Sequence, residues 1–245
     1  MPEISVPVRD RLIVALDLPR AAAARRVVEA LGDAARTFKV GKQLFTAAGP
    51  GLVRELVSGG KKVFLDLKYH DIPNTVAGAV GEAARLGVSM LTVHASGGAK
   101  MLKAAVEAAA DSEKPPAILA VTVLTSLNDR DLQEIGVSGR VLDQVLRLAE
   151  LAQTAGCRGI VASAHEAREL RRVLGAGLWI VTPGVRPAGG DRDDQERVVT
   201  PADAMRAGAD YIVVGRPIVQ AKDPGEAARK VLAELEQACR KVASG

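Results

Sequence analysis

The stretch KKVFLDLKYHDIPNT, residues 61–75, predicts a strand and a functional site at the end of that strand. Its first half alternates as a strand does, so Asp66 and Lys68 share one face. A strand buried on both faces should be apolar throughout, whereas this one carries a carboxylate and an ammonium two residues apart. Asp71 follows as the strand ends, and Pro73 then begins a helix, where its missing N–H is harmless.

The charges at this strand end have two interpretations. A buried pair of Asp66 and Lys68 could be purely structural, but such pairs are seldom stabilising because desolvation costs about as much as the attraction returns. Three charges crowded together are better explained by chemistry. Two carboxylates flanking one lysine would keep it protonated, so Lys68 is predicted to donate a proton rather than to act as a neutral Schiff-base amine.

Composition excludes several classes of protein. The chain has 245 residues, 48% hydrophobic and 25% charged, which suits one globular domain over residues 1–245. A net charge of +4 and only 2% aromatic residues argue against a nucleic-acid partner. No segment predicts a membrane span or a secretory leader, and two cysteines suggest a reducing compartment. We therefore expect a cytoplasmic protein, and the three unpaired histidines predict no zinc site.

Predicted strands and helices alternate along the whole chain. Eight such units in about 250 residues are typical of a TIM (β/α)8 barrel. A doubly wound open sheet is the alternative, but no glycine-rich dinucleotide fingerprint follows any strand. One helix is predicted to start after Gly49-Pro50-Gly51. The predicted strands are residues 11–17, 37–41, the first half of 61–75, 88–94, 117–124, 158–162, 178–182 and 210–215.

A barrel places its active site at the carboxyl ends of its strands. Polar residues recur at those predicted ends. Each is weak evidence alone, because a strand end is often where solvent begins, but the Asp and Lys residues of the first three strands stand out. His70 and His94 are given no catalytic role, because a charged lysine is central to the cluster. The strand-end residues are Asp17, Lys39, Asp66, Lys68, His94, Thr125, Ser126, Ser163, Arg186 and Arg216.

The last two strands predict a phosphate site. In this fold the loops after strands 7 and 8 commonly hold a phosphate through backbone N–H groups and a helix N-terminus. Gly215 would let the backbone approach the anion, and Arg216 can bind it bidentately. Arg186 offers a second cation. Gln195 lies in a polar loop, residues 183–199, that is long enough to suggest a closing lid.

Residues 66–75 resemble the signature of the orotidine 5′-phosphate decarboxylase family, whose core is the pattern D-x-K-x-x-D-I-P-x-T. Tyr69 is the one departure, since Phe is usual there, and it changes no chemistry. The resemblance covers the whole chain and is closest to the bacterial branch. Its other motifs follow in the expected order at residues 15–17, 38–41, 124–126, 183–187, 194–195 and 215–217.

The resemblance implies a homodimeric TIM barrel that makes UMP from orotidine 5′-monophosphate without a cofactor or a metal. It implies that Asp71 and Thr75 serve the partner subunit's site. The implied catalytic residues are Lys68, Asp66, Asp71 and Lys39. The implied substrate contacts are Asp17 and Lys39 for the ribose, Thr125 and Ser126 for the pyrimidine, and Arg186, Gln195, Gly215 and Arg216 for the phosphate.

Two rival functions stay open. A magnesium-dependent sugar-phosphate decarboxylase or aldolase of the same barrel group resembles this chain in the D-x-K-x-x-D core. The continuation through residues 72–75 and Gln195 favour the nucleotide enzyme. A catalytically silent phosphate-binding barrel would have lost Lys68 or one of its aspartates, and Lys68, Asp66 and Asp71 are all present.

Overall fold

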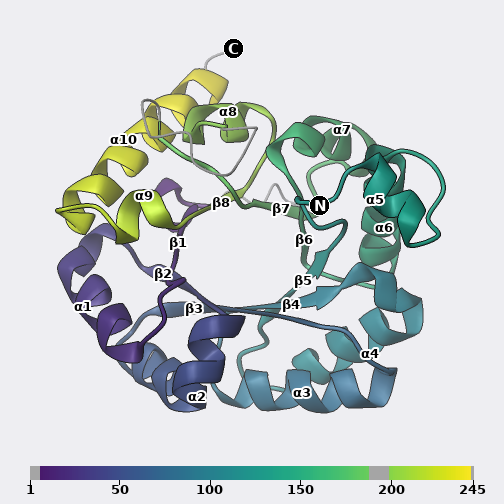
Figure 1. Cartoon of the computed structure of the whole chain (residues 1–245), viewed down its shortest axis with the longest axis horizontal. Helices are drawn as coiled ribbons and strands as arrows, with labels where there is room; N and C mark the ends of the chain where they lie inside the picture. Colours follow the sequence, from purple (N-terminus) through teal and green to yellow (C-terminus); the bar gives the residue numbers. More distant parts are fainter. Residues whose placement is uncertain (1–5, 188–198, 244–245) are drawn as a thin grey trace.

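In the computed structural model, which describes residues 6–187 and 199–243, eight parallel strands close into a barrel in the order β1 to β8. Figure 1 looks down this barrel, with helices forming the outer ring. Closure is made where Ile13 of the first strand pairs in parallel with Val213 of the last. This confirms the predicted TIM barrel over the doubly wound sheet, whose edge strands would stay apart. Gln195 lies outside the described residues.

The strands coincide with the predicted segments but most of them are shorter. At the first and last strands the chain leaves the sheet early, so Asp17 lies two positions beyond β1 and Gly215 one position beyond β8. Lys39, Asp66, Lys68 and His94 lie inside their strands. The strands are β1 (Leu12–Ala15), β2 (Thr37–Gly41), β3 (Lys62–Tyr69), β4 (Met90–His94), β5 (Ala117–Val121), β6 (Gly159–Val161), β7 (Trp179–Thr182) and β8 (Tyr211–Val214).

Helices cover the outside of the barrel. Two of their N-termini are stabilised as their sequences suggest: Glu166 accepts a hydrogen bond from Ser163 N–H at 2.8 Å, and Thr200 Oγ1 accepts one from Asp203 N–H at 3.1 Å. The helices are η1 (Val8–Asp10), α1 (Ala21–Leu31), η2 (Gly32–Ala34), α2 (Lys42–Ser58), α3 (Pro73–Arg85), η3 (Ala95–Gly97), α4 (Gly98–Ala110), α5 (Asp129–Glu134), α6 (Val141–Thr154), α7 (Ala164–Leu174), α8 (Pro201–Arg206), α9 (Arg216–Val219) and α10 (Pro224–Ala243).

The predicted start of α2 was wrong. The helix begins at Lys42, directly after β2, and the Gly49-Pro50 pair lies inside it at a kink. Gly49 has φ of 65°, a left-handed conformation that glycine adopts without steric cost, and Pro50 has no N–H to donate to the preceding turn. The glycine–proline signal therefore marks a break between two helical segments, and the first segment places Lys42 at the carboxyl end of β2.

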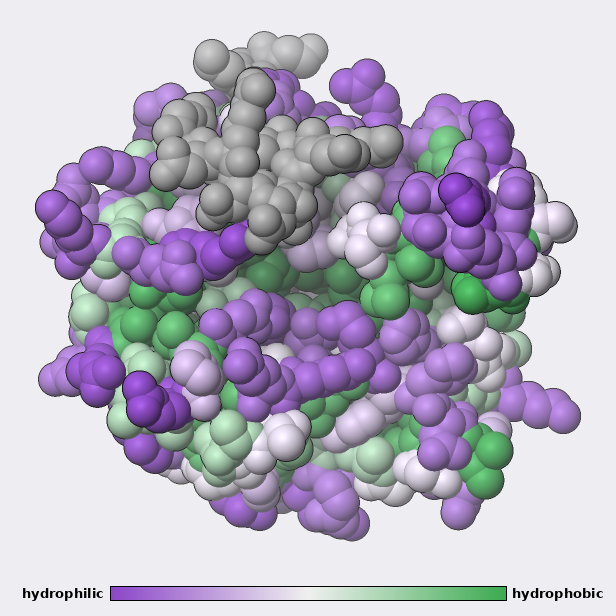
Figure 2. Space-filling model, viewed as in Figure 1, coloured by the Kyte–Doolittle hydropathy of each residue, from purple (hydrophilic) through white to green (hydrophobic). Residues whose placement is uncertain are grey.

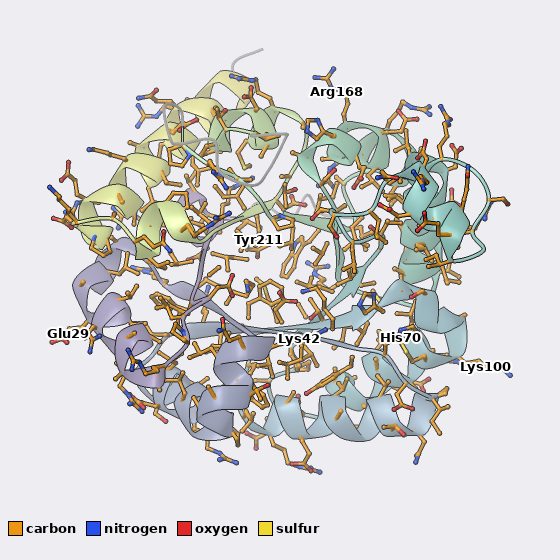
Figure 3. All side chains as sticks on the ribbon, in the orientation of Figure 1. Glu29, Lys42, His70, Lys100, Arg168 and Tyr211 are labelled. Carbon is orange, nitrogen blue, oxygen red and sulfur yellow. The ribbon has the colours of Figure 1, made fainter. Side chains whose placement is uncertain are left out.

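The interior of the barrel positions the site. One hydrophobic cluster fills the space between sheet and helices, and a smaller one, which includes Ala15 and Phe64, fills the barrel. Because alternate residues of a strand share a face, Asp17 and Asp66 continue these inward-facing rows toward the carboxyl ends. Figure 3 shows Tyr211 inside the ring of strands, whereas Glu29, Lys100 and Arg168 lie on its outer rim. The charged residues therefore lie directly above the apolar side chains that fill the barrel.

Candidate active site

Lys68 lies in a bulge of β3. Leu65 pairs with Leu91 of β4 and Tyr69 pairs with Val93, so residues 66–68 stand opposite Thr92 alone. Lys68 has φ of 53°, and no other non-glycine residue in the described ranges has a positive φ. Such a conformation is costly for a residue with a Cβ atom and is often found at functional sites. The regular alternation predicted for this strand is therefore interrupted between Leu65 and Tyr69, at the charged residues.

Four charged side chains from three neighbouring strands form an alternating network. Lys68 Nζ lies 2.7 Å from Asp66 Oδ1, and Lys39 Nζ lies 3.6 Å from Asp66 Oδ2. Lys39 Nζ also donates to Asp17 Oδ1 at 2.8 Å. The side chain of Asp66 is 12% exposed, against 58% for Asp17. The network thus runs from solvent at Asp17 to a largely buried centre at Asp66, as the clustering of Asp and Lys in the sequence suggested.

The environment keeps Asp66 ionised. Burial by itself raises the pKa of this carboxyl group. The ammonium groups of Lys39 and Lys68, together with hydrogen bonds from Lys68 and Thr92, outweigh burial and hold the pKa of Asp66 below its ordinary value. At neutral pH a carboxylate therefore lies between two ammonium groups, and it fixes Lys68 from one side.

Gly41 makes room for this network, a role that sequence reasoning did not give it. It ends β2 and pairs with Asp66 in the sheet register. A Cβ atom at this position would lie 3.1 Å from Asp17 Oδ1 and 3.1 Å from Lys39 Nζ. The missing side chain thus leaves the space in which the ion pair of Asp17 and Lys39 forms.

Thr92 is the second residue that sequence reasoning missed. It lies on β4, its side chain is buried, and its hydroxyl contacts both Asp66 and Lys68. The signal in the sequence was faint: a single polar residue inside an otherwise apolar strand, two positions before His94. Only the register between β3 and β4 shows what that hydroxyl touches.

Asp71 does not reach Lys68 within this chain. It is exposed in the loop between β3 and α3, and its Oδ1 accepts a hydrogen bond from the N–H of Ile72 at 2.6 Å. Within residues 6–187 and 199–243 its carboxylate forms no ion pair. Ile72 beside it is 67% exposed, unusual for a large apolar side chain, and Thr75 is exposed in the first turn of α3. Among the residues that the structure describes, Lys68 thus has one carboxylate partner, Asp66.

Apart from Gln195, which lies outside the described residues, the residues predicted to bind the pyrimidine and the phosphate lie at the same end of the barrel. Thr125 and Ser126 are exposed in the segment after β5. Arg186 follows β7 and is buried. Its backbone N–H donates to the backbone carbonyl of Val199 at 3.0 Å, so the chain segments on either side of residues 188–198 are joined. Gly215 precedes α9, and Arg216 is the exposed first residue of that helix.

Two histidines border the lysine. The rings of His70 and His94 lie 5.4 Å apart. Burial lowers the pKa of His94, and electrostatic interactions with His70, Lys42 and Lys68 lower it further, against the opposing effect of the Asp66 carboxylate. His94 is therefore neutral at neutral pH. Figure 3 shows His70 and Lys42 beside β3 and β4, and Figure 2 shows hydrophilic side chains gathered across the middle of the same face.

The described residues bring together no group of three or more His, Cys, Asp or Glu side chains with the geometry to hold a metal ion. None of the helices in the described ranges combines the length and the apolar character needed to cross a membrane.

A closed (β/α)8 barrel with a lysine–carboxylate network at the carboxyl ends of its first strands is the architecture of a barrel enzyme. Residues 10–231 match the model of the orotidine 5′-phosphate decarboxylase / HUMPS family, and the chain belongs to this family. Its motifs in residues 66–75 are thus explained by common descent.

Individual relatives agree with the family assignment. The chain is 54% identical over 239 residues to an orotidine 5′-phosphate decarboxylase of Moorella thermoacetica, covering 95% of each chain. It is 54% identical over 235 residues to that of Halorhodospira halophila, covering 96% of this chain and all of the relative. The crystal structure of an orotidine 5′-phosphate decarboxylase from Lactobacillus acidophilus is similar with a TM-score of 0.84 at 38% identity, over 92% of this chain and 99% of that one.

Proposed function

We propose that this protein is an enzyme that decarboxylates orotidine 5′-monophosphate to UMP, in de novo pyrimidine biosynthesis. The observation that carries the proposal is the ion pair of Lys68 and Asp66, 2.7 Å apart at the mouth of the barrel, with Lys39 on the other side of the carboxylate. Relatives that are 54% identical over nearly their whole length and bear the name of this enzyme support the same substrate.

The charges provide a mechanism. Breaking the bond between C6 and the carboxylate releases CO₂ and leaves an electron pair at C6, where no neighbouring group of the ring delocalises it well. The ammonium of Lys68 stabilises that charge as it forms, because a preorganised charge in a closed site acts strongly on a developing anion. Lys68 Nζ then gives its proton to C6, which completes UMP, and the lysine recovers a proton from water.

The other network residues hold Lys68 and the sugar. Asp66 holds the ammonium of Lys68 in place through a hydrogen bond of 2.7 Å. Lys39 holds the second oxygen of Asp66, and with Asp17 it contacts the ribose hydroxyl groups. Since the ion pairs exist before substrate arrives, little reorganisation is needed when charge develops in the transition state.

The phosphate lies at the part of the barrel mouth formed by the ends of β7 and β8. Arg186, Gln195, Gly215 and Arg216 bind it, while Thr125 and Ser126 contact the pyrimidine. Binding energy from a phosphate far from C6 contributes to orienting the ring and closing the site. Arg216 supplies a cation for this phosphate at the start of α9, directly after β8.

The active enzyme is a cytoplasmic homodimer in which Asp71 and Thr75 complete the partner subunit's site. The exposure of Asp71, Thr75 and Ile72, and the lack of an ion pair of Asp71 within the described residues of its own chain, support this arrangement. A two-fold interface presents the same surface twice and so yields two equivalent sites.

The test is an absorbance assay with orotidine 5′-monophosphate, run with and without a metal chelator. We expect the same turnover in both. A magnesium-dependent sugar-phosphate decarboxylase or aldolase shares the D-x-K-x-x-D core, and it would leave the nucleotide unchanged and act on a sugar phosphate only without chelator. Absence of nucleotide turnover by the folded protein would overturn the proposal.

A further inference from the structure

The hydroxyl of Thr92 joins both members of the central ion pair. It donates a hydrogen bond to Asp66 Oδ1 at 3.0 Å and accepts one from the backbone N–H of Lys68 at 2.9 Å. A threonine hydroxyl has one proton to donate and lone pairs to accept, so it makes both bonds at once. The side chain is completely buried, which keeps water from replacing either bond.

These two bonds lie where the sheet is irregular. Residues 66–68 stand opposite Thr92 alone, so the backbone ladder between β3 and β4 is interrupted there. Buried backbone N–H groups need an acceptor, and the side chain of Thr92 supplies one for Lys68 in place of a carbonyl of β4. The same bond holds the residue whose φ is 53°.

We propose that Thr92 is a positioning residue for the decarboxylation, and this inference rests on the function proposed above. One hydroxyl fixes the left-handed backbone of Lys68 and the rotation of the Asp66 carboxylate. Asp66 Oδ1 then faces Lys68 Nζ at 2.7 Å, and Oδ2 is left for Lys39. Without this hydroxyl, the bulge relaxes and the ammonium of Lys68 moves away from C6.

Thr92→Val tests the hydroxyl at nearly constant shape. It keeps the branched side chain and removes both the donor and the acceptor. We expect kcat to fall by about 100-fold, the effect of displacing a reacting group by roughly 1 Å. UMP affinity should change little, because the residues proposed to bind ribose and phosphate stay in place. Thr92→Ser keeps the hydroxyl and should retain most of the wild-type kcat.

Thr182→Val is the matched control. Thr182 is another completely buried strand threonine, and its Oγ1 has no hydrogen-bond partner within the described residues. The same substitution there removes no bond and should leave kcat unchanged. If Thr92→Val does not fold, Thr92→Ser and Thr92→Ala replace it, because these two variants differ only in the hydroxyl.

Amide hydrogen exchange of Lys68 gives a readout that does not depend on turnover. It should be slow in wild type and in Thr92→Ser, and faster in Thr92→Val, while exchange elsewhere in β3 stays the same. Wild-type kcat in Thr92→Val, or equal loss of kcat and UMP affinity, would overturn the positioning role. The two proposals can fail separately. If the wild-type protein does not turn over the nucleotide but the Lys68 amide exchanges slowly, the proposed function is contradicted and the hydrogen bond from Lys68 N–H to Thr92 is still supported.

Discussion

The ammonium of Lys68 lies 2.7 Å from Oδ1 of Asp66, two positions earlier on the same strand, while the backbone of Lys68 is left-handed. Two residues of one strand thus form an ion pair across a bulge. A regular strand would also place both residues on one face, but without the bulge the side chain of Lys68 would leave the strand in a different direction. The cost of this backbone conformation is borne by the surrounding sheet, as is usual for strain at a functional site.

Lys68→Ala should abolish turnover. Loss of the proton donor costs about 10⁴-fold, the upper end of what general acid–base groups contribute. The protein should stay folded, because Asp66 keeps Lys39 as a partner. Steady-state assays and thermal unfolding measure both effects. Lys62→Ala is the control, since Lys62 lies on the same strand and pairs with the distant Asp10. Normal turnover of the Lys68 variant would remove this lysine from the mechanism.

Arg216→Ala should weaken substrate binding and turnover, because it removes a cation from the proposed phosphate site. A truncated substrate that lacks the phosphate should be turned over poorly, and added phosphite dianion should restore part of that activity. This activation by phosphite should be larger in wild type than in Arg216→Ala. Arg168→Ala serves as control, since Arg168 lies on the outer rim of the barrel (Figure 3). An unchanged affinity of Arg216→Ala for UMP would count against this assignment.

Subunit mixing tests whether Asp71 acts across the dimer. Inactive Lys68→Ala and inactive Asp71→Ala chains are combined and allowed to exchange. In a mixed dimer one site then carries both lesions and the other carries neither, so activity should approach about a quarter of wild type if half the dimers are mixed. If both residues act within one chain, mixing restores nothing. Exchange is verified with a tag on one variant, and inactive mixed dimers would refute the shared site.

Gly41→Ala should lower kcat/KM by roughly 10-fold, because the new Cβ atom displaces Asp17 or Lys39 by a few tenths of an ångström. Gly51→Ala is the matched control: a Cβ atom there meets nothing within 4 Å and its backbone has no positive φ. Both variants are compared in the nucleotide assay and by thermal unfolding. Equal kinetics for the two alanines would show that the space beside Gly41 is unimportant.

The lowered pKa of Asp66 makes stability depend on pH. Because this pKa is lower in the folded than in the unfolded chain, its contribution is fully present above the ordinary value of 3.8 and is lost as pH falls through the lowered value. Denaturant titrations at neutral pH should find Asp66→Asn less stable than wild type. The difference should shrink below pH 3.8. A difference that is constant with pH would mean that Asp66 is not held ionised by its neighbours.

Local patterns in the sequence predicted much of this protein. Apolar runs and helix signals gave the alternating elements, since period and capping depend on neighbours in the chain. Charges at predicted strand ends pointed to Asp66, Lys68 and Lys39, because a barrel brings those ends together whatever their exact register. The motif of residues 66–75 by itself indicated the family.

Only the tertiary structure decided the details that hold the site. The bulge opposite Thr92, the space beside Gly41 and the failure of Asp71 to reach Lys68 all depend on how strands and loops meet. A sequence pattern records which face a residue takes within its own strand. It does not record which residue of the next strand stands opposite, because hydrogen-bond register is fixed by packing between segments far apart in the chain.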